Sequence, residues 1–284
     1  MYYWLDDHLT DENECHIPVG RGLWYGDGCF ETLLVEHGKT YGLDLHLERL
    51  RKGMRYLDFP NKPDLDDRIQ TGITEVLKAC ELLNKSARVR IQVWREGSTG
   101  FAPPAGAKVR LHIMASEVLT DISPINLATV STRRITAVSV RSDLKLSSAV
   151  NYIRAAAEAR QQGADEALML TTNGHISETT IANIFWLIDD TVYTPSDDCD
   201  LLPGIIREAF MDWVQTEQND LKLRAGQYTP DVLKKAEAVW LTNSVRLIQP
   251  VGRLDSITLN KSVTLMEKIR YNFRLFLAER YTTV

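Results

Sequence analysis

Lys145 is the strongest candidate in this sequence for a reactive residue. It lies in residues 141–148, between a predicted strand and a predicted helix. A deprotonated lysine amine is a nucleophile toward carbonyl carbons. Taken alone, a lysine in a loop is most often a solvated surface residue. The case for a reactive lysine therefore depends on the polar motifs that follow it.

Glu178 belongs to the first of these motifs. It lies in residues 174–186, where small hydroxyl residues and Asn183 precede an apolar run. Such a composition is typical of an anion-binding turn. A glutamate between a turn and a strand is also often a simple edge-strand charge. Both interpretations stay open on the residues alone.

Two further motifs could bind an anion. Gly204 stands at the start of a predicted helix, where free backbone N–H groups suit a phosphate. Asn243 and Ser244 end a predicted strand in amide and hydroxyl groups. An ordinary loop-to-helix junction and an ordinary turn explain the same residues, so neither motif is specific by itself.

Composition excludes several classes of protein. The chain has 284 residues, of which 44% are hydrophobic and 25% are charged, as in ordinary globular proteins. A net charge of −5 argues against nucleic acid or an anionic membrane as the main partner. No apolar run is long enough to cross a membrane, and residues 1–7 do not resemble a signal peptide. Four scattered cysteines, without a CxxC pair, predict a reduced cytoplasmic protein and no metal site.

Periodicity predicts mixed secondary structure in the first part of the chain. Apolar residues recur every three or four positions in residues 43–57 and 64–83, which predicts two helices. Residues 29–35 and 87–94 alternate like strands, and residues 109–114 should pair with the second of these. We expect this part to form a small N-terminal α/β domain, residues 1–117.

A linker at residues 118–125 is predicted to lead into a larger domain, residues 126–284. The expected elements of this domain are a strand at 135–140, a helix at 149–162, strands at 167–171, 184–188, 238–242 and 249–254, a helix after 201–207 and a helix at 262–277. The predicted fold class is therefore α/β, or mixed α+β, in two domains. Because pockets favour domain interfaces, we expect a site between them.

Taken together and in order, these motifs resemble the fold-type IV pyridoxal-phosphate family, the class IV aminotransferases. The most specific stretch is residues 163–186, and residues 21–32 and 46–50 match as well. The resemblance extends from about residue 19 to residue 251. The family contains branched-chain aminotransferases, D-amino-acid aminotransferases, R-selective amine transaminases and 4-amino-4-deoxychorismate lyases. Its fold implies a second domain that resembles a β-barrel with helices.

The resemblance implies pyridoxal 5′-phosphate as the cofactor and gives roles to three residues. Lys145 would hold the cofactor as a Schiff base and later move a proton between Cα and C4′. Glu178 would pair with the pyridine nitrogen, which makes the ring an electron sink. Arg49 would bind the phosphate, although a solvent-facing helix arginine is the plain alternative.

Other residues are implied to surround the cofactor and the substrate. The phosphate is expected to contact backbone N–H groups or hydroxyls at Thr180, Ile181, Ile205, Ile206 and Ser244. Leu202 corresponds to a leucine on which the ring rests, and Tyr25 and Phe30 match positions on the substrate side. The family also implies a homodimer whose subunits share their active sites.

The motifs favour an aminodeoxychorismate lyase, which releases pyruvate and 4-aminobenzoate. Residues 26–32, 100–104, 164–168 and 243–251 resemble those enzymes. Such lyases often carry Lys-His-Leu-Asn-Arg at the reactive lysine, whereas this chain reads Lys145-Leu-Ser-Ser-Ala. This difference leaves the lyase assignment open.

A transaminase that uses D-amino acids, branched-chain amino acids or R-amines with a keto-acid acceptor is the alternative. The Arg-x-His pair of D-amino-acid enzymes is absent from residues 96–104, and Asn151-Tyr152 comes two residues later than in branched-chain enzymes. A non-catalytic scaffold is disfavoured because both Lys145 and Glu178 are present.

A small amino substrate with a carboxylate requires a cation. The candidates are Arg21, Arg88, Arg90 and Arg95. Arg88 and Arg90 should share one face of a strand, because successive side chains alternate between its faces. That face points either to the substrate or to solvent, and the sequence leaves both possibilities open.

Overall fold

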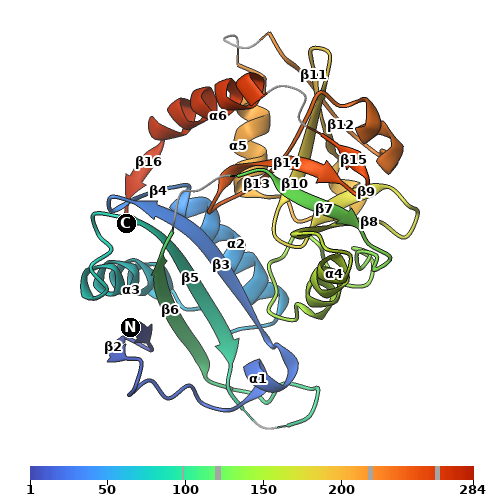
Figure 1. The fold of residues 1–284 in the computed structure, drawn as a ribbon. Helices are drawn as coiled ribbons and strands as arrows, with labels where there is room; N and C mark the ends of the chain where they lie inside the picture. Colours follow the sequence, from blue (N-terminus) through green and yellow to red (C-terminus); the bar gives the residue numbers. More distant parts are fainter. Residues whose placement is uncertain (98, 119–122, 217–219, 260–262) are drawn as a thin grey trace. The chain divides into compact units, whose positions relative to one another are not determined.

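A computed structural model describes residues 1–97, 99–118, 123–216, 220–259 and 263–284 (Figure 1). The chain divides into two compact units. Unit 1 comprises Met1–Leu119, Leu144–Ala149 and Arg280–Val284, and unit 2 comprises Thr120–Asp143 and Val150–Glu279. Part of the predicted linker, residues 119–122, lies outside the described residues.

Unit 1 contains, among its described residues, a seven-stranded antiparallel sheet in the order β16-β4-β3-β5-β6-β1-β2. Its strands are β1 (Tyr2–Leu5), β2 (His8–Asp11), β3 (Gly28–Glu36), β4 (Lys39–Tyr41), β5 (Ser86–Arg95), β6 (Val109–Glu117) and β16 (Tyr281–Thr283). The three predicted strands are therefore confirmed as β3, β5 and β6. The longest of them lie side by side in Figure 1.

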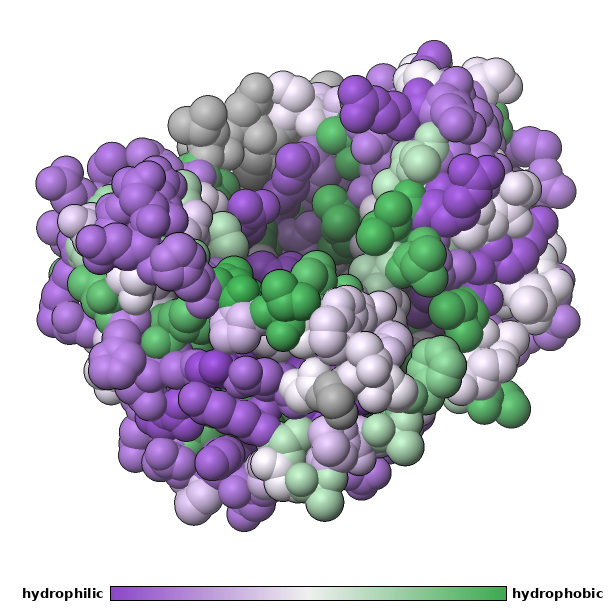
Figure 2. Space-filling model, turned by 90° about the horizontal axis from the view of Figure 1, so that it is seen from below, coloured by the Kyte–Doolittle hydropathy of each residue, from purple (hydrophilic) through white to green (hydrophobic). Residues whose placement is uncertain are grey.

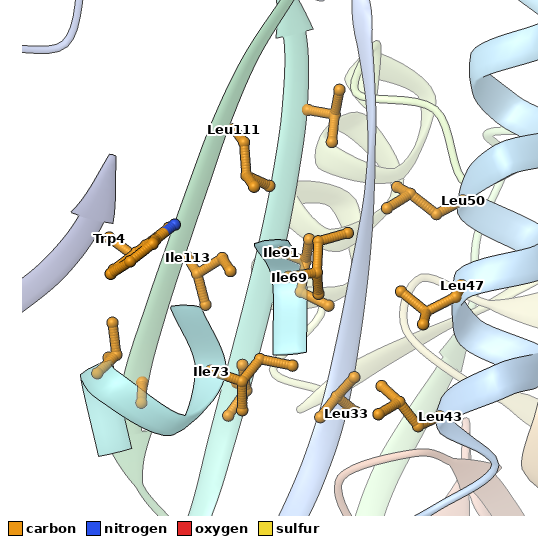
Figure 3. Packing of buried hydrophobic residues seen from close by; sticks show 14 of the residues in the cluster. Trp4, Leu33, Leu43, Leu47, Leu50, Ile69, Ile73, Ile91, Leu111 and Ile113 are labelled. Atoms are coloured by element: carbon orange, nitrogen blue, oxygen red, sulfur yellow. The ribbon is translucent and has the colours of Figure 1, made fainter. Parts of the chain in front are cut away.

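The core of unit 1 lies between one face of this sheet and two helices, α2 (Leu43–Tyr56) and α3 (Leu65–Ala79). Figure 3 shows side chains of α2 directed toward Leu33 of β3, with Ile91 and Ile113 of the neighbouring strands in the same cluster. Alternation buries this face and leaves Arg88 and Arg90 on the other. A short helix, α1 (Arg21–Tyr25), precedes β3.

Unit 2 contains a nine-stranded sheet within the described part of the chain, in the order β12-β11-β10-β13-β14-β7-β8-β9, with β15 paired to β14. Its strands are β7 (Ile125–Thr129), β8 (Glu166–Leu170), β9 (Ile176–Thr179), β10 (Asn183–Ile188), β11 (Thr191–Pro195), β12 (Lys222–Gly226), β13 (Ala238–Asn243), β14 (Leu247–Leu254) and β15 (Ile257–Thr258). The sheet curls, since β9 at one end also contacts β10 and β11. A hydrophobic core that includes Trp186 fills the curl, as in a barrel.

In the described residues of unit 2, three α-helices accompany this sheet: α4 (Val150–Gln161), α5 (Ile205–Val214) and α6 (Val263–Ala278). Two 3₁₀ helices, η1 (Asp197–Cys199) and η2 (Pro230–Lys235), connect strands. The mixed α/β fold class with a barrel-like second unit is thus confirmed. The predicted helices at 149–162 and 262–277 correspond to α4 and α6, although Ser262 lies outside the described residues.

The strand predicted at residues 135–140 is wrong. These residues form a loop and a turn, in which Thr136 accepts hydrogen bonds from the amides of Ser139 and Val140. Val138 is 98% exposed, so the apolar residues of this run have no sheet to pack on. The real strand of the region is β7, which lies within and after the segment predicted as a linker.

The face of the molecule in Figure 2 is largely hydrophilic, with smaller areas of hydrophobic residues. Large exposed hydrophobic side chains include Trp24 and Phe101 of unit 1 and Val150 and Ile153 of unit 2. None of the helices in the described ranges combines the length and apolar character needed to cross a bilayer.

Candidate active site

The Lys145 segment is bound to strand β3 although it lies more than a hundred residues later in the chain. The Phe30 amide donates to the Lys145 carbonyl at 3.0 Å, and the Ser147 amide donates to the Gly28 carbonyl at 2.8 Å. Leu146 forms an isolated antiparallel bridge with Cys29. Backbone pairing therefore fixes the residue on each side of Leu146 against the start of β3.

The ring of Phe30 contacts two basic side chains. The Lys145 Nζ is 4.7 Å from the centroid of its ring, and the Arg90 guanidinium carbon is 3.8 Å from it. Both distances allow cation–π attraction. Burial and then the nearby Arg88 lower the pKa of Arg90 below its ordinary value. A bound anion would offset that cost, so this is a favourable place for a carboxylate.

The other candidate arginines have different environments. Arg21 is buried, pairs with Asp27 at 2.7 Å and donates to the carbonyls of Gly100 and Phe101. Arg95 is also buried and donates to the Leu57 carbonyl. Both therefore hold loops in place.

Arg88 shares a face with Arg90, as predicted, but it is exposed. Arg90 is thus the candidate arginine that contacts the same ring, Phe30, as Lys145.

Tyr25 lies at the end of α1, where its hydroxyl accepts a hydrogen bond from the Gly100 amide at 3.0 Å. Its ring is 5.5 Å from that of Phe101. Tyr25 therefore contacts the loop after β5.

Arg49 projects from α2 onto Glu31, a fully buried carboxylate of β3. The Arg49 Nε and Nη2 donate to the two carboxylate oxygens at 2.7 and 2.8 Å, and His46 lies 2.7 Å from Glu31 Oε2. Glu31 and His46 are 0% and 1% exposed, while the Arg49 side chain is 11% exposed. Arg49 is therefore held by a buried acid and is not the solvent-facing arginine of the plain alternative.

Charge pairing decides the ionisation of this cluster. Burial alone would raise the pKa of Glu31, but Arg49 and then His46 more than offset this effect and lower it to about 2. For His46 the order is reversed, because burial lowers its pKa more than Glu31 raises it. Arg49 and Lys145 lower it further. The cluster is thus an arginine–glutamate ion pair with a neutral histidine.

In unit 2, Glu178 occupies β9 and is 3% exposed. One carboxylate oxygen accepts from the Tyr152 hydroxyl at 2.8 Å and pairs with Arg134 Nε at 3.0 Å. The other accepts from the Leu202 amide at 3.0 Å. The strand fixes this carboxylate, and the predicted anion-binding turn begins only after it.

Arg134 and Tyr152 were not singled out from the sequence as site residues. The Arg134 guanidinium carbon lies 4.5 Å from the centroid of the Tyr152 ring. Burial and then the Glu178 carboxylate raise the pKa of Tyr152 well above its ordinary value of 10.0. The only sequence signal was the displaced Asn151-Tyr152 pair, whereas nothing near Arg134 indicated a partner for Glu178.

Three segments predicted to bind phosphate meet around the start of β10. Asn183 donates to the Leu202 carbonyl at 2.8 Å, and a Cβ on Gly204 would lie 2.2 Å from Asn183 Oδ1. Asn243, beside Ser244, donates to the Ile181 carbonyl at 3.4 Å. The sequence motif indicates Asn183 as a polar residue of this site, but it does not predict the contact of Asn183 with residues 202–204.

The backbone donors of these segments differ. Ile205 and Ile206 are the first residues of α5, so their amides have no acceptor within the helix. No side chain in the described part of the chain caps this terminus. Thr180, in contrast, donates from its amide at 3.0 Å and from its hydroxyl at 2.6 Å to Glu166. Thr180 is therefore already bound, whereas the α5 terminus remains a suitable anion site.

The donor and acceptor groups fit the expected cofactor. Glu178 is a buried, paired carboxylate that already receives O–H and N–H hydrogen bonds, as it would from a protonated ring nitrogen. The terminus of α5, with Gly204 in close contact with Asn183, offers N–H groups to a phosphate. Within the described ranges, no group of three or more His, Cys, Asp or Glu residues could hold a metal ion.

Comparisons with known proteins agree with this chemistry. A family model described as amino-transferase class IV matches residues 28–254. The chain is 27% identical to aminodeoxychorismate lyase of Bacillus subtilis, covering 90% of this chain and 87% of the relative. It is 26% identical to a putative branched-chain-amino-acid aminotransferase of Methanocaldococcus jannaschii, covering 96% of each. The branched-chain aminotransferase of Escherichia coli has the same fold, with a TM-score of 0.88 at 22% identity over 98% of this chain and 95% of that one.

Proposed function

The chain belongs to the class IV aminotransferases, a family of pyridoxal-phosphate enzymes, and we propose that it is a cytoplasmic aminodeoxychorismate lyase that carries its cofactor on Lys145. The observation that carries this proposal is the pair of cations on Phe30. Lys145 Nζ and the Arg90 guanidinium lie against one ring, so a reactive amine and a carboxylate-binding group are neighbours. A substrate with both an amino group and a carboxylate suits this arrangement.

The remaining residues would hold the cofactor. Arg49, oriented by Glu31, and the amides of Ile205 and Ile206 would bind the phosphate. Glu178 would keep a proton on the ring nitrogen, because a buried carboxylate that pairs with Arg134 can accept that N–H. The chemistry that the cofactor supplies when bound is an electron sink next to the substrate nitrogen. Lys145 Nζ would then accept and return the proton.

The lyase is supported by relatives as well as by Arg90. Two aminodeoxychorismate lyases, from Bacillus subtilis and Vibrio harveyi, match 90% and 86% of this chain. Their substrate carries carboxylates, for which Arg90 would be the anchor. A transaminase is the second candidate, because the branched-chain relative from Methanocaldococcus jannaschii covers 96% of this chain.

The two candidates are distinguished by their products. Purified protein loaded with pyridoxal 5′-phosphate is incubated with aminodeoxychorismate, and 4-aminobenzoate and pyruvate are measured. In parallel, D-alanine, L-leucine or an R-amine is supplied with 2-oxoglutarate, and glutamate is measured. We expect pyruvate and 4-aminobenzoate in equal amounts, and neither from Lys145→Ala. Glutamate formation without pyruvate release would establish the transaminase.

We also propose that the protein is a homodimer with shared active sites. The support is a cluster of aromatic side chains in unit 1, in which Tyr25 contacts the exposed rings of Trp24 and Phe101, since apolar surface patches often mark interfaces. Light scattering coupled to gel filtration is expected to give twice the chain mass of 32.2 kDa. A monomer at micromolar concentration would contradict this proposal.

A further inference from the structure

The segment after Lys145 carries an unusual side-chain contact. Gln92 of β5 donates from Nε2 to the Ser147 hydroxyl oxygen at 2.7 Å. The same nitrogen lies 3.2 Å from the Cys29 carbonyl oxygen. Ser147 is thus held by its amide to Gly28 and by its hydroxyl to Gln92.

The opposite end of the Gln92 amide faces the cation beside Lys145. Arg90 donates from Nη2 to Gln92 Oε1 at 2.9 Å. A guanidinium has no acceptor, so this contact requires the amide oxygen to face Arg90 and the nitrogen to face Ser147. Gln92 therefore connects two groups, Arg90 and the Lys145 segment, with one fixed orientation.

The gap that receives Ser147 is narrow. A Cβ on Gly28 would lie 2.4 Å from the Val93 carbonyl oxygen and 3.1 Å from Ser147 Oγ. Gly26, at φ +64°, lies so close that its Cβ would be 2.9 Å from Ser148 Cα. Gly26 and Gly28 therefore leave the room in which the Lys145 segment lies against β3.

We propose that Gln92 is a positioning residue for this enzyme, acting through Ser147 on the Lys145 backbone and through Oε1 on the Arg90 guanidinium. The proposal rests on the proposed function of Lys145 and Arg90. Arg90 has five N–H donors, so binding to Gln92 leaves others for a carboxylate. Misplacement by about 1 Å can cost roughly 100-fold in rate. Gln92 consequently affects both the reacting amine and the substrate anchor.

The test compares variants of the loaded enzyme. Ser147→Ala removes only the hydroxyl, Gln92→Glu reverses the hydrogen bond to Ser147 and adds a negative charge while keeping an acceptor for Arg90, and Gln92→Leu removes both contacts. Ser148→Ala is the matched control, because Ser148 is exposed and its side chain makes no hydrogen bond within the described residues. Three quantities are measured: the pH midpoint of the visible absorbance of the bound cofactor, kcat and KM separately, and the melting temperature.

We expect Ser147→Ala and Gln92→Glu to move the pH midpoint of absorbance and to lower kcat about 10-fold or more. Gln92→Leu should in addition raise KM, because Arg90 loses a partner. Combining Gln92→Leu with Ser147→Ala should lower kcat no further than Gln92→Leu alone. Ser148→Ala should resemble the wild type in all three quantities.

The proposal is overturned if Ser147→Ala and Gln92→Glu leave the absorbance midpoint and kcat unchanged, even when melting temperatures fall. It is also overturned if Gln92→Leu and Ser147→Ala together lower kcat by the product of their separate effects. Failure of the proposed role of Lys145 gives a different result. In that case borohydride reduction would not attach the cofactor to the peptide containing Lys145 in the wild type.

Discussion

Arg49 and Glu31 form a two-point ion pair inside unit 1, in which Nε and Nη2 each donate to a different carboxylate oxygen, at 2.7 and 2.8 Å. The pair joins helix α2 to strand β3. Both side chains are largely shielded from water, and His46 adds a third contact to the same carboxylate. The arginine is therefore oriented before any anion arrives, which lowers the entropic cost of binding one.

Replacing this acid should affect both stability and cofactor binding. Glu31→Gln leaves Arg49 without its buried counter-charge, which costs about 3–5 kcal/mol of unfolding free energy. We expect a weaker affinity for pyridoxal 5′-phosphate, because Arg49 loses its fixed orientation. Urea unfolding and cofactor titration by absorbance measure the two effects.

Glu48→Gln is the control on the same helix. Among the described residues, Glu48 pairs with Arg51 and Arg55 at the surface. Such pairs contribute about 0–1 kcal/mol. If Glu48→Gln lost as much unfolding free energy and cofactor affinity as Glu31→Gln, a special role for Glu31 would be contradicted.

The same carboxylate predicts how stability depends on pH. Glu31 has a pKa lowered from 4.5 to about 2, so its ionised form is favoured in the folded state. Its contribution is complete above pH 4.5 and is lost as the pH falls toward 2. At about 1.4 kcal/mol per pKa unit this amounts to about 3 kcal/mol. The unfolding free energies of wild type and Glu31→Gln, measured from pH 6 to pH 2.5, should converge at the acid end; a constant difference would refute the assignment.

Arg90 should determine substrate affinity. Arg90→Met removes the cation that lies 3.8 Å from the Phe30 ring centroid. Loss of hydrogen bonds from a charged group costs about 1.5–3 kcal/mol, so KM for a carboxylate substrate should rise roughly 10- to 150-fold. Steady-state kinetics measures this KM. The control is Arg88→Met, because Arg88 is the exposed arginine on the same face of β5. If Arg88→Met raised KM as much as Arg90→Met, Arg90 would not be the anchor.

Gly204 should tolerate no side chain. A Cβ there would lie 2.2 Å from Asn183 Oδ1, whose side chain also donates to the Leu202 carbonyl. We expect Gly204→Ala to cost about 1–3 kcal/mol through overpacking and to weaken cofactor binding at the α5 terminus. Thermal melts without the cofactor measure the loss of stability, and the further rise in melting temperature on adding the cofactor measures its binding. In Gly20→Ala the new Cβ would have ordinary contacts of 3.5 Å or more, so this control should be near neutral.

Buried thiols should not react with thiol reagents. Burial and then the Glu31 charge raise the pKa of Cys29 to about 12, and Cys29 is 1% exposed. Because the thiolate is the reactive form, Cys29 should be labelled only after unfolding. Cys15 and Cys80 are half-buried and should be labelled first in the native protein. Mass spectrometry after timed alkylation tests this order, and rapid native labelling of Cys29 would contradict it.

Local periodicity was sufficient for much of the fold. Helix α2 and strand β5 begin and end within one residue of their predicted bounds, because each buries one face and exposes the other. Residues 135–140 show the limit of this reasoning. Their apolar residues satisfy a strand pattern, but a strand also requires a neighbour, and the neighbour is a long-range property.

The site was predictable only where a motif is continuous. Lys145 and Glu178 were found from ordered motifs. Arg134 and Tyr152 act on Glu178 from separate segments, and their contacts depend on how β9, α4 and the 130–134 loop pack. Gln92 was invisible for the same reason, since its partner Ser147 is a neighbour only after the chain has returned to β3.

That return of the chain has a consequence for synthesis. Unit 1 is assembled from three stretches, and its last strand, β16, pairs with β4 near the opposite end of the sequence. A nascent chain that has emerged only as far as β6 contains most of the sheet but neither the lysine nor this edge strand. Co-translational folding of unit 1 therefore stops short of a competent enzyme, and the lysine joins its sheet only later in translation.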